Sequence, residues 1–256
     1  MVATQISTPP PSKKAQASGP FTLALDIGGT GLKAAILNAK GKMLTERLRI
    51  LTPENCPPVL MLTKLKELVA LIPPTAPAYD RISVGFPGVV RDGKVYTAHN
   101  LGTRPWVKFD LAQAVTKQFG KPCRLINDAD LQGLAAVGQF GGKGVELVIT
   151  LGTGVGSSLF ENGRLLPHME FAHHPLRNGE TYEGQLGDVT LKAVGKKRWN
   201  KRVQIAIETL RNLINFDHLY IGGGNAEKVK FKLPADVSII PNTLGMIGGI
   251  YLWRNE

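Results

Sequence analysis

A chain of 256 residues with 43% hydrophobic content can form a sizeable core or the two lobes of a split domain. It has no apolar run of about 18 residues, no apolar signal-peptide core and two cysteines, which predicts a cytoplasmic protein without membrane spans or a disulfide framework. Its net charge of +11 indicates a polyanionic partner, such as nucleic acid, an anionic surface or polyphosphate.

Residues 1–20 are predicted to form a disordered tail. They contain three consecutive prolines, scattered Ser, Thr, Gln and Ala, and almost no large apolar side chains. Such a segment cannot bury enough apolar surface to offset the conformational entropy lost on ordering.

The first structured element is predicted to be a hairpin built around a glycine turn. Residues 21–27 and 32–37 are apolar runs typical of strands. Because glycine has no Cβ, backbone N–H groups in the turn can approach a phosphate closely, and a threonine adds a hydroxyl donor. Asp26 is placed to hold Mg²⁺ beside that phosphate, directly or through water. An ordinary Gly-rich hairpin is the alternative. The phosphate-binding candidates are Asp26, Gly28, Gly29, Thr30 and Lys33.

A polar loop follows several ordinary elements. We predict a third strand from Met43, a helix at residues 57–72, a strand at 81–86 and a hairpin at 89–95. In the loop at residues 96–102, Asn100 can offer its amide oxygen and nitrogen to adjacent hydroxyl groups. Its alternative role is that of an Asx-turn residue.

The chemical centre is predicted where a short strand, residues 123–126, leads into a helix at 131–140. A hydroxyl that attacks phosphorus must lose its proton, and a carboxylate at a strand end facing a cleft can accept it. Asp128 is the candidate base. The alternative is that Asn127, Asp128 and Asp130 only cap the helix, and we expect Asp130 to be such a cap.

Two later segments repeat the pattern of strand and glycine turn. Residues 147–159 form a second predicted hairpin, and residues 219–225 run from a strand into a third turn. Similar hairpins in the two halves of the chain predict a duplicated fold that closes on a phosphoryl donor. The further phosphate-binding candidates are Gly152, Thr153, Gly154, Gly222, Gly223 and Gly224.

With these motifs in this order, the sequence from Phe21 to Trp253 resembles the ROK (repressor, open reading frame, kinase) family of hexose kinases. The resemblance implies an α/β fold of two lobes, the duplicated actin-like ATPase (ribonuclease H-like) fold of sugar kinases. The lobes are expected at residues 21–126 and 127–256, with a last helix at about 242–253 packing back on the first lobe. A homodimer is also expected.

The resemblance assigns roles to several side chains. Asp128 matches the catalytic aspartate, and Asn100 lies where related kinases place a sugar-binding Asn. Glu170 and His173 resemble a Glu-x-Gly-His motif whose side chains hold sugar hydroxyls, although Ala172 replaces the glycine. Asn127 is expected to bind the sugar or orient the loop.

The segment after His173 departs from the family pattern. Many ROK proteins carry a zinc-binding cysteine cluster there, but no cysteine follows Cys123 in this chain, so we predict no zinc. Glu180 and Glu183 are retained, and the sequence leaves open whether either contacts the sugar.

A basic run precedes a predicted amphipathic helix at residues 203–214 and the third glycine turn, which borders adenosine in related kinases. Most such runs are solvated helix faces. A basic strip beside the donor site would also suit a phosphate chain longer than a nucleotide, as in the polyphosphate glucokinases that the first turn and Asn127–Asp130 resemble. Polyphosphate is therefore favoured over ATP. The run comprises Lys192, Lys196, Lys197, Arg198, Lys201 and Arg202.

These features predict Mg²⁺-dependent transfer of phosphate from polyphosphate, and also from ATP, to the 6-hydroxyl of glucose. The alternatives are a strictly ATP-dependent glucokinase, a kinase for mannose, fructose or an amino sugar, and a non-catalytic sugar sensor. ROK repressors carry an N-terminal helix-turn-helix module, whereas a Pro-rich tail precedes the first hairpin here. With Asp128 present, this argues against specific nucleic-acid binding.

Overall fold

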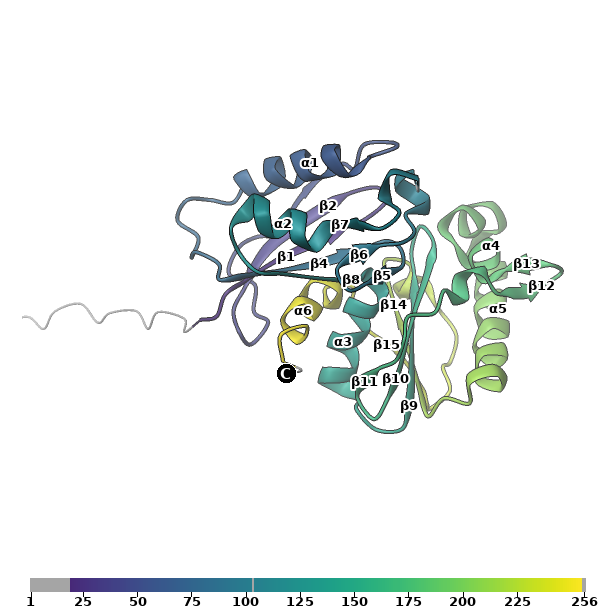
Figure 1. The fold of residues 1–256 in the computed structure, drawn as a ribbon. Coiled ribbons are helices and arrows are strands. Elements are labelled where there is room, and N and C mark those ends of the chain that lie inside the picture. Colours follow the sequence, from purple (N-terminus) through teal and green to yellow (C-terminus); the bar gives the residue numbers. More distant parts are fainter. Residues whose placement is uncertain (1–18, 103, 255–256) are drawn as a thin grey trace, which may run out of the picture.

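The structure is a computed structural model that describes residues 19–102 and 104–254. The predicted tail, residues 1–20, therefore lies almost entirely outside the described residues. Two five-stranded sheets form the framework (Figure 1). The first has the strand order β3-β2-β1-β4-β8, and its members are β1 (Thr22–Ile27), β2 (Leu32–Leu37), β3 (Leu48–Ile50), β4 (Arg81–Phe86) and β8 (Cys123–Asn127).

The second sheet repeats the topology of the first. In each sheet the first strand is central, pairs antiparallel with the second strand and parallel with the fourth. This repetition confirms the predicted duplicated fold. The order is β11-β10-β9-β14-β15, with β9 (Val145–Leu151), β10 (Val155–Glu161), β11 (Arg164–Leu165), β14 (His218–Gly222) and β15 (Val237–Ile239).

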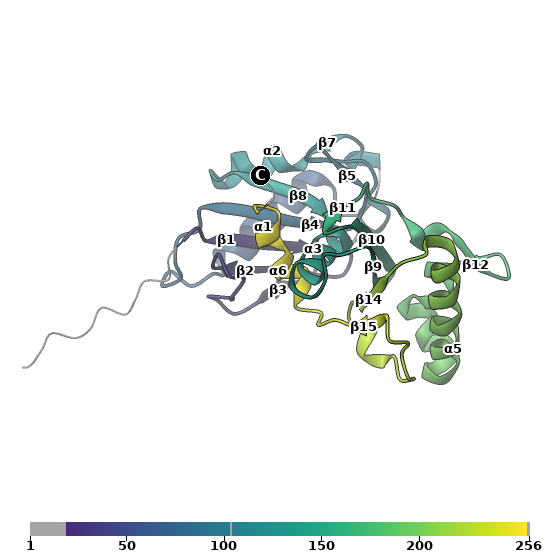
Figure 2. The ribbon, with the colours of Figure 1, turned by 90° about the horizontal axis from the view of Figure 1, so that it is seen from below.

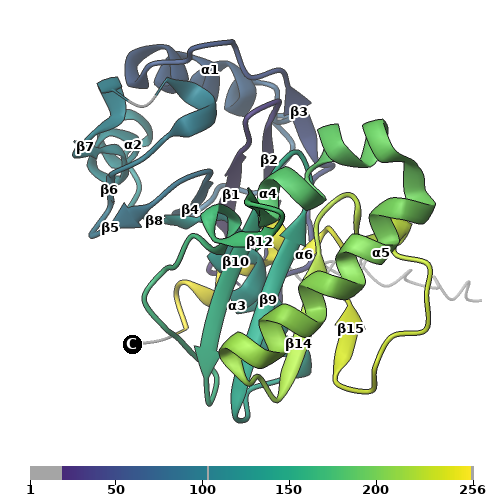
Figure 3. The same ribbon diagram turned by 90° about the vertical axis from the view of Figure 1, so that its right-hand side faces the viewer.

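Helices cover the outer face of each sheet. On the first sheet these are α1 (Pro58–Ala70) and α2 (Leu111–Phe119); on the second they are α4 (Tyr182–Leu186) and α5 (Asp188–Ile214), with α5 crossing the sheet in Figure 3. No helix among the described residues is long and apolar enough to span a bilayer.

Short strands and 3-10 helices connect the main helices and the strands of the two large sheets. These connecting elements are β5 (Val90–Arg91), β6 (Lys94–Val95), β7 (Phe109–Asp110), β12 (Pro175–Arg177), β13 (Glu180–Thr181) and the 3-10 helices η1 (His99–Leu101), η2 (Arg104–Trp106), η3 (Phe171–His173) and η4 (Ala226–Lys228).

Two helices lie between the sheets. Helix α3 (Asp128–Phe140) contacts strands of both sheets, and α6 (Leu244–Tyr251) lies along α3 and across β1, β2 and β4 (Figure 2). Ser83 on β4 donates a hydrogen bond to the carbonyl of Gly249 at 2.6 Å. The last helix therefore packs on the first sheet, whereas the lobe boundary after residue 126 stays a prediction because α3 contacts both halves.

Several predicted boundaries were wrong. The helix expected at residues 203–214 is only the second half of α5, which begins at Asp188 and bends at Gly195, where φ is 77°. Buried Leu191, Trp199 and Val203 anchor the basic first half, whose many charges obscured this stripe in the sequence. The strand expected from Met43 begins at Leu48, since Met43 makes a single bridge.

Close packing of α6 on α3 gives a stability prediction. A Cβ on Gly248 would lie 1.9 Å from the carbonyl oxygen of Leu131, whereas a Cβ on Gly245, in the same helix, meets nothing within 4 Å. We expect Gly248→Ala to lower the free energy of unfolding by about 1–3 kcal/mol through overpacking. Gly245→Ala should leave it unchanged or raise it by up to about 1 kcal/mol through helix propensity. Urea denaturation measures both, and equal losses in the two variants would contradict this packing argument.

Candidate active site

A cavity of about 480 Å³ lies between the two halves of the chain. The residues predicted to bind the sugar or the transferred phosphate line it with one exception, which brings the three glycine turns together with the polar loops. The exception is Gly222, which ends β14, where a Cβ would meet the Gln132 side chain. The predicted residues that line the cavity are Asp26, Gly28, Gly29, Thr30, Lys33, Asn100, Asn127, Asp128, Gly152, Thr153, Gly154, Glu170, His173, Gly223 and Gly224.

The first glycine turn is closed by local hydrogen bonds. The Gly28 N–H donates to the Gly31 carbonyl at 3.1 Å, and Thr52 Oγ1 donates to the Gly28 carbonyl at 2.6 Å. Lys33 Nζ lies 2.7 Å from Asp26 Oδ2, so Lys33 neutralises and orients this carboxylate. Asn100 packs directly on the turn, because a Cβ on Gly29 would lie 3.0 Å from Asn100 Cβ.

The second turn is braced by the third turn and by the start of α5. Asn225 Nδ2 donates to the Gly152 carbonyl at 3.1 Å, and the Asp188 N–H donates to the same carbonyl at 3.1 Å. Glu183 lines the cavity at this turn and accepts from the Val155 N–H at 3.5 Å. Glu180, by contrast, does not line the cavity and accepts a hydrogen bond from Gln185.

The start of α3 positions Asp128. Asn127 Oδ1 caps the helix by accepting from the N–H groups of Ala129 at 2.7 Å and Asp130 at 3.2 Å. Its Nδ2 donates to the Gly88 carbonyl at 3.1 Å. The expectation that Asp130 is the cap was therefore wrong, because the Asn127 side chain occupies that role and Asp130 points elsewhere. Asn127 thus ties the start of α3 to the Gly88 loop, and its contact with the sugar stays a prediction.

The surroundings of Asp128 raise the pKa of its carboxyl group. It is half-buried, and its Oδ1 accepts a hydrogen bond from the Ala129 N–H at 2.9 Å. Burial, followed by the negative charge of Asp26, raises the pKa of Asp128 to about 7. A base works best when its pKa lies near the operating pH, because it is then both available and strong enough to accept a proton.

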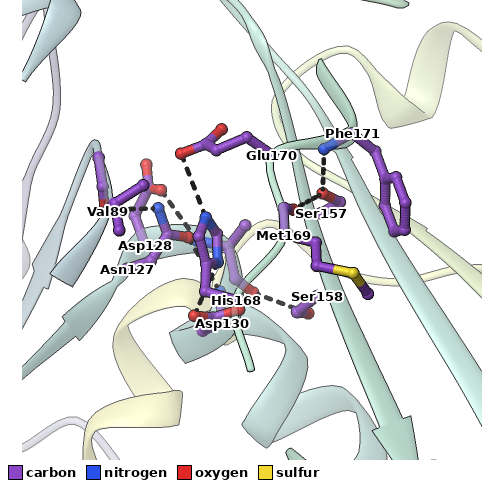
Figure 4. A network of polar contacts seen from close by, with 12 residues as sticks. Val89, Asn127, Asp128, Asp130, Ser157, Ser158, His168, Met169, Glu170 and Phe171 are labelled. Carbon is purple, nitrogen blue, oxygen red and sulfur yellow. Dashed lines mark hydrogen bonds and ion pairs between the residues drawn. The ribbon is translucent and has the colours of Figure 1, made fainter. Parts of the chain in front are cut away.

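His168, which the sequence analysis did not select, connects two acidic residues of the site (Figure 4). Its Nδ1 lies 2.9 Å from Asp130 Oδ2 and its Nε2 lies 3.2 Å from Glu170 Oε1, with only 8% of its side chain exposed. Burial by itself lowers the pKa of His168. The contacts with Asp130 and Glu170 outweigh burial and raise this pKa to about 9. The imidazolium in turn lowers the pKa of Glu170, so Glu170 faces the cavity as a carboxylate.

Two histidines from opposite halves meet at the cavity wall. The rings of His99 on η1 and His173 on η3 lie 5.3 Å apart, edge to face. Both line the cavity beside Asn100 and Glu170. This part of the wall therefore combines amide, carboxylate and imidazole groups, a set suited to hydrogen bonding with the hydroxyls of a small polar molecule.

The basic run on α5 is separate from the cavity. None of its six residues lines the cavity, and Lys192 pairs with Asp188 at 2.6 Å while 76% of its side chain stays exposed. Two arginines that the sequence analysis missed, Arg47 and Arg49, line it instead. No group of three or more His, Cys, Asp or Glu residues that could hold a metal occurs within residues 19–102 and 104–254.

Comparison with known proteins gives consistent matches. The profile of the ROK family matches residues 22–175. The polyphosphate glucokinase of Mycobacterium leprae (strain TN) is 29% identical over 259 residues, which cover 96% of this chain and 78% of that protein. The crystal structure of the inorganic polyphosphate/ATP-glucomannokinase from Arthrobacter sp. strain KM is 30% identical, with a TM-score of 0.82 over 93% of this chain and 100% of that one.

A more distant structure agrees in fold. The ROK family glucokinase from Streptomyces griseus, solved with glucose and AMPPNP, is 17% identical and has a TM-score of 0.75 over 92% of this chain and 100% of that one. These matches confirm the resemblance to ROK kinases and to polyphosphate glucokinases that the glycine turns indicated. The chain therefore belongs to the ROK family and has the two-lobed, actin-like α/β fold of its sugar kinases.

Proposed function

We propose that this chain is a hexose kinase that transfers the terminal phosphoryl group of polyphosphate, and also of ATP, to the 6-hydroxyl of glucose. The observation that carries the proposal is the place of Asp128, whose carboxylate shares one cavity with the glycine turns and with Asn100, Glu170 and His173. Similar proteins named polyphosphate glucokinase and polyphosphate/ATP-glucomannokinase support the choice of sugar and donor.

In this mechanism the sugar is held from both halves of the chain. The Asn100 carboxamide, the Glu170 carboxylate and the His173 imidazole bind sugar hydroxyls, and His168 keeps Glu170 charged and oriented. Asp128 accepts the proton of the 6-hydroxyl as its oxygen attacks the terminal phosphorus. The bond between that phosphorus and the leaving phosphate oxygen breaks in line with the attack, and backbone N–H groups of the glycine turns stabilise the phosphoryl oxygens.

Magnesium fits the residues present. Mg²⁺ is bound in kinases by one or two carboxylates together with substrate phosphates, and Asp26 supplies such a carboxylate beside the first glycine turn. When bound, the ion neutralises charge on the phosphate chain. Asp26 would hold it, directly or through water, and Lys33 keeps that carboxylate in place at 2.7 Å.

The proposal is tested by measuring glucose 6-phosphate formation with Mg²⁺ and either long-chain polyphosphate or ATP, at low and high salt. We expect turnover with both donors, a higher rate with polyphosphate, and a steeper loss with salt for polyphosphate. Turnover with ATP alone would contradict the polyphosphate assignment, and a substrate panel containing mannose, fructose and amino sugars checks the hexose. If no combination of donor and sugar gives turnover, the remaining alternative is a non-catalytic sugar sensor, which calorimetry would detect as glucose binding.

A further inference from the structure

A row of charged side chains crosses the edge of the first sheet beside the first glycine turn. Asp26 on β1 lies directly opposite Lys33 on β2, and Lys33 lies directly opposite Arg49 on the edge strand β3. Residues directly opposite one another on neighbouring strands point to the same face of a sheet. All three line the cavity, as does Arg47, which immediately precedes β3.

Among the residues that the structure describes, no acidic side chain compensates the positive charge at the outer end of this row. Lys33 is paired with Asp26, whereas Arg49 donates to the Thr30 carbonyl, at 3.3 Å. In the described part of the chain, no carboxylate lies within 4.0 Å of the guanidinium of Arg47 or Arg49. Both side chains are exposed and free to receive an anion.

Arg49 also lies very close to the turn that is proposed to hold the transferred phosphoryl group. A Cβ on Gly31 would lie 2.6 Å from Arg49 Nε, so only glycine lets the guanidinium reach this position. An anion that extends from the turn toward β3 therefore meets Arg49 first and Arg47 next. The third glycine turn, which also lines the cavity, has an acidic neighbour instead, because Asn225 Nδ2 lies 3.4 Å from Asp188 Oδ1.

We propose that Arg47 and Arg49 bind the part of a linear polyphosphate chain that lies beyond the transferred phosphoryl group. The proposal rests on the proposed function and assigns its donor path to β3 of the first half, in place of the basic run on α5. Guanidinium groups suit this role because their fork of N–H groups binds phosphate oxygens in pairs and stays charged at every accessible pH.

The test compares two double variants that each remove two positive charges. Arg47→Gln/Arg49→Gln removes the proposed site, and Lys196→Gln/Lys197→Gln removes two exposed cations of α5. The readout is kcat/KM with long-chain polyphosphate divided by kcat/KM with ATP. We expect this ratio to fall about tenfold or more for each arginine removed, because the loss of one hydrogen bond between charged groups weakens binding by about that factor. The lysine variant should keep the ratio within about twofold.

Salt dependence gives a second readout. Removing two phosphate contacts should reduce the slope of log affinity for polyphosphate against log salt in the arginine variant, and leave it unchanged in the lysine variant. A fall of the ratio in the lysine variant and not in the arginine variant would overturn the proposal. An unchanged ratio and slope in the arginine variant would overturn it too.

Direct binding separates this proposal from the proposed function. Calorimetric titration of the unmodified protein and both variants with long-chain polyphosphate needs no turnover. If the protein lacks kinase activity but binds polyphosphate through the arginines, the function fails and the site stands. If kinase activity with polyphosphate is present and the arginine variant binds polyphosphate as tightly as the unmodified protein, the site fails and the function stands. Thermal unfolding checks that both variants fold.

Discussion

Asp128→Asn is expected to lower kcat for glucose phosphorylation by about 10²- to 10⁴-fold, the usual contribution of a general base. Asparagine matches the shape of aspartate and keeps the oxygen that accepts from the Ala129 N–H, so the start of α3 is preserved. Its amide cannot accept the proton of the 6-hydroxyl. The variant should be at least as stable as the unmodified protein, because it removes a carboxylate whose ionised form is disfavoured by burial.

Glucose 6-phosphate assays and urea unfolding measure the two effects together. Turnover close to that of the unmodified protein would contradict the assignment of Asp128 as base, whatever the stability. Loss of turnover accompanied by loss of folding would point to a structural role. A matched control is Asp92→Asn, which changes a carboxylate at the exposed tip of the β5–β6 hairpin and should alter neither quantity.

The pH profile tests the same residue without mutation. Asp128 is active as a carboxylate, and its pKa of about 7 means that protonation removes the base below neutral pH. The value of kcat/KM should therefore rise through about pH 7 and level off above it. A profile that is flat from pH 5.5 to 8 would contradict the raised pKa.

His168→Leu is expected to destabilise the fold by about 3–5 kcal/mol, since it removes one partner of a buried charge pair and leaves Asp130 without compensation. His174→Leu, an exposed histidine nearby, is the matched control and should change stability by less than about 0.5 kcal/mol. Urea denaturation at pH 7 measures both.

A second substitution separates charge from packing. Adding Asp130→Asn to His168→Leu removes the uncompensated carboxylate and should recover part of the lost stability. If the loss in free energy of unfolding of the double variant equals the sum of the losses of the two single variants, His168 and Asp130 are not energetically coupled. Equal stability of the two histidine variants would contradict the buried pair altogether.

The same pair predicts how stability depends on pH. The pKa of His168 is raised from 6.5 to about 9 in the folded chain, so the folded state holds a proton that the unfolded state releases. The stabilisation is fully present below pH 6.5 and is lost as the pH rises through about 9. Unfolding experiments at pH 6 and pH 9.5 should show this loss, and His168→Leu should reduce it. Parallel losses in both proteins would assign the pH effect to other groups.

The elements that the sequence predicted well are those with a local signal. Strand β2 was expected at residues 32–37 and occupies them, because a short run that is apolar except for Lys33, bounded by glycine on one side and a polar turn on the other, marks a buried strand. The duplication was visible because the two hairpins use the same residue types. The first half of α5 was missed, since its buried residues are widely spaced among lysines and arginines.

The parts of the site that were missed depend on contacts between distant segments. His168 has no motif of its own, and its role follows from Asp130, which a different element supplies. Arg49 becomes relevant only through the register of β3 against β2, which places it opposite Lys33. The basic run on α5 was conspicuous as a sequence cluster, but helix geometry directs its side chains away from the cavity.

The position of α6 has a consequence for how the chain acquires its structure during translation. The ribosome completes β1, β2 and β4 early, yet the helix that covers one face of these strands is made only after β15. Until then Ala24, Ala35 and Leu37 face water, although they are buried in the finished protein. The first half therefore cannot reach its final stability before α6 has been synthesised, although α6 follows β4 by more than 150 residues.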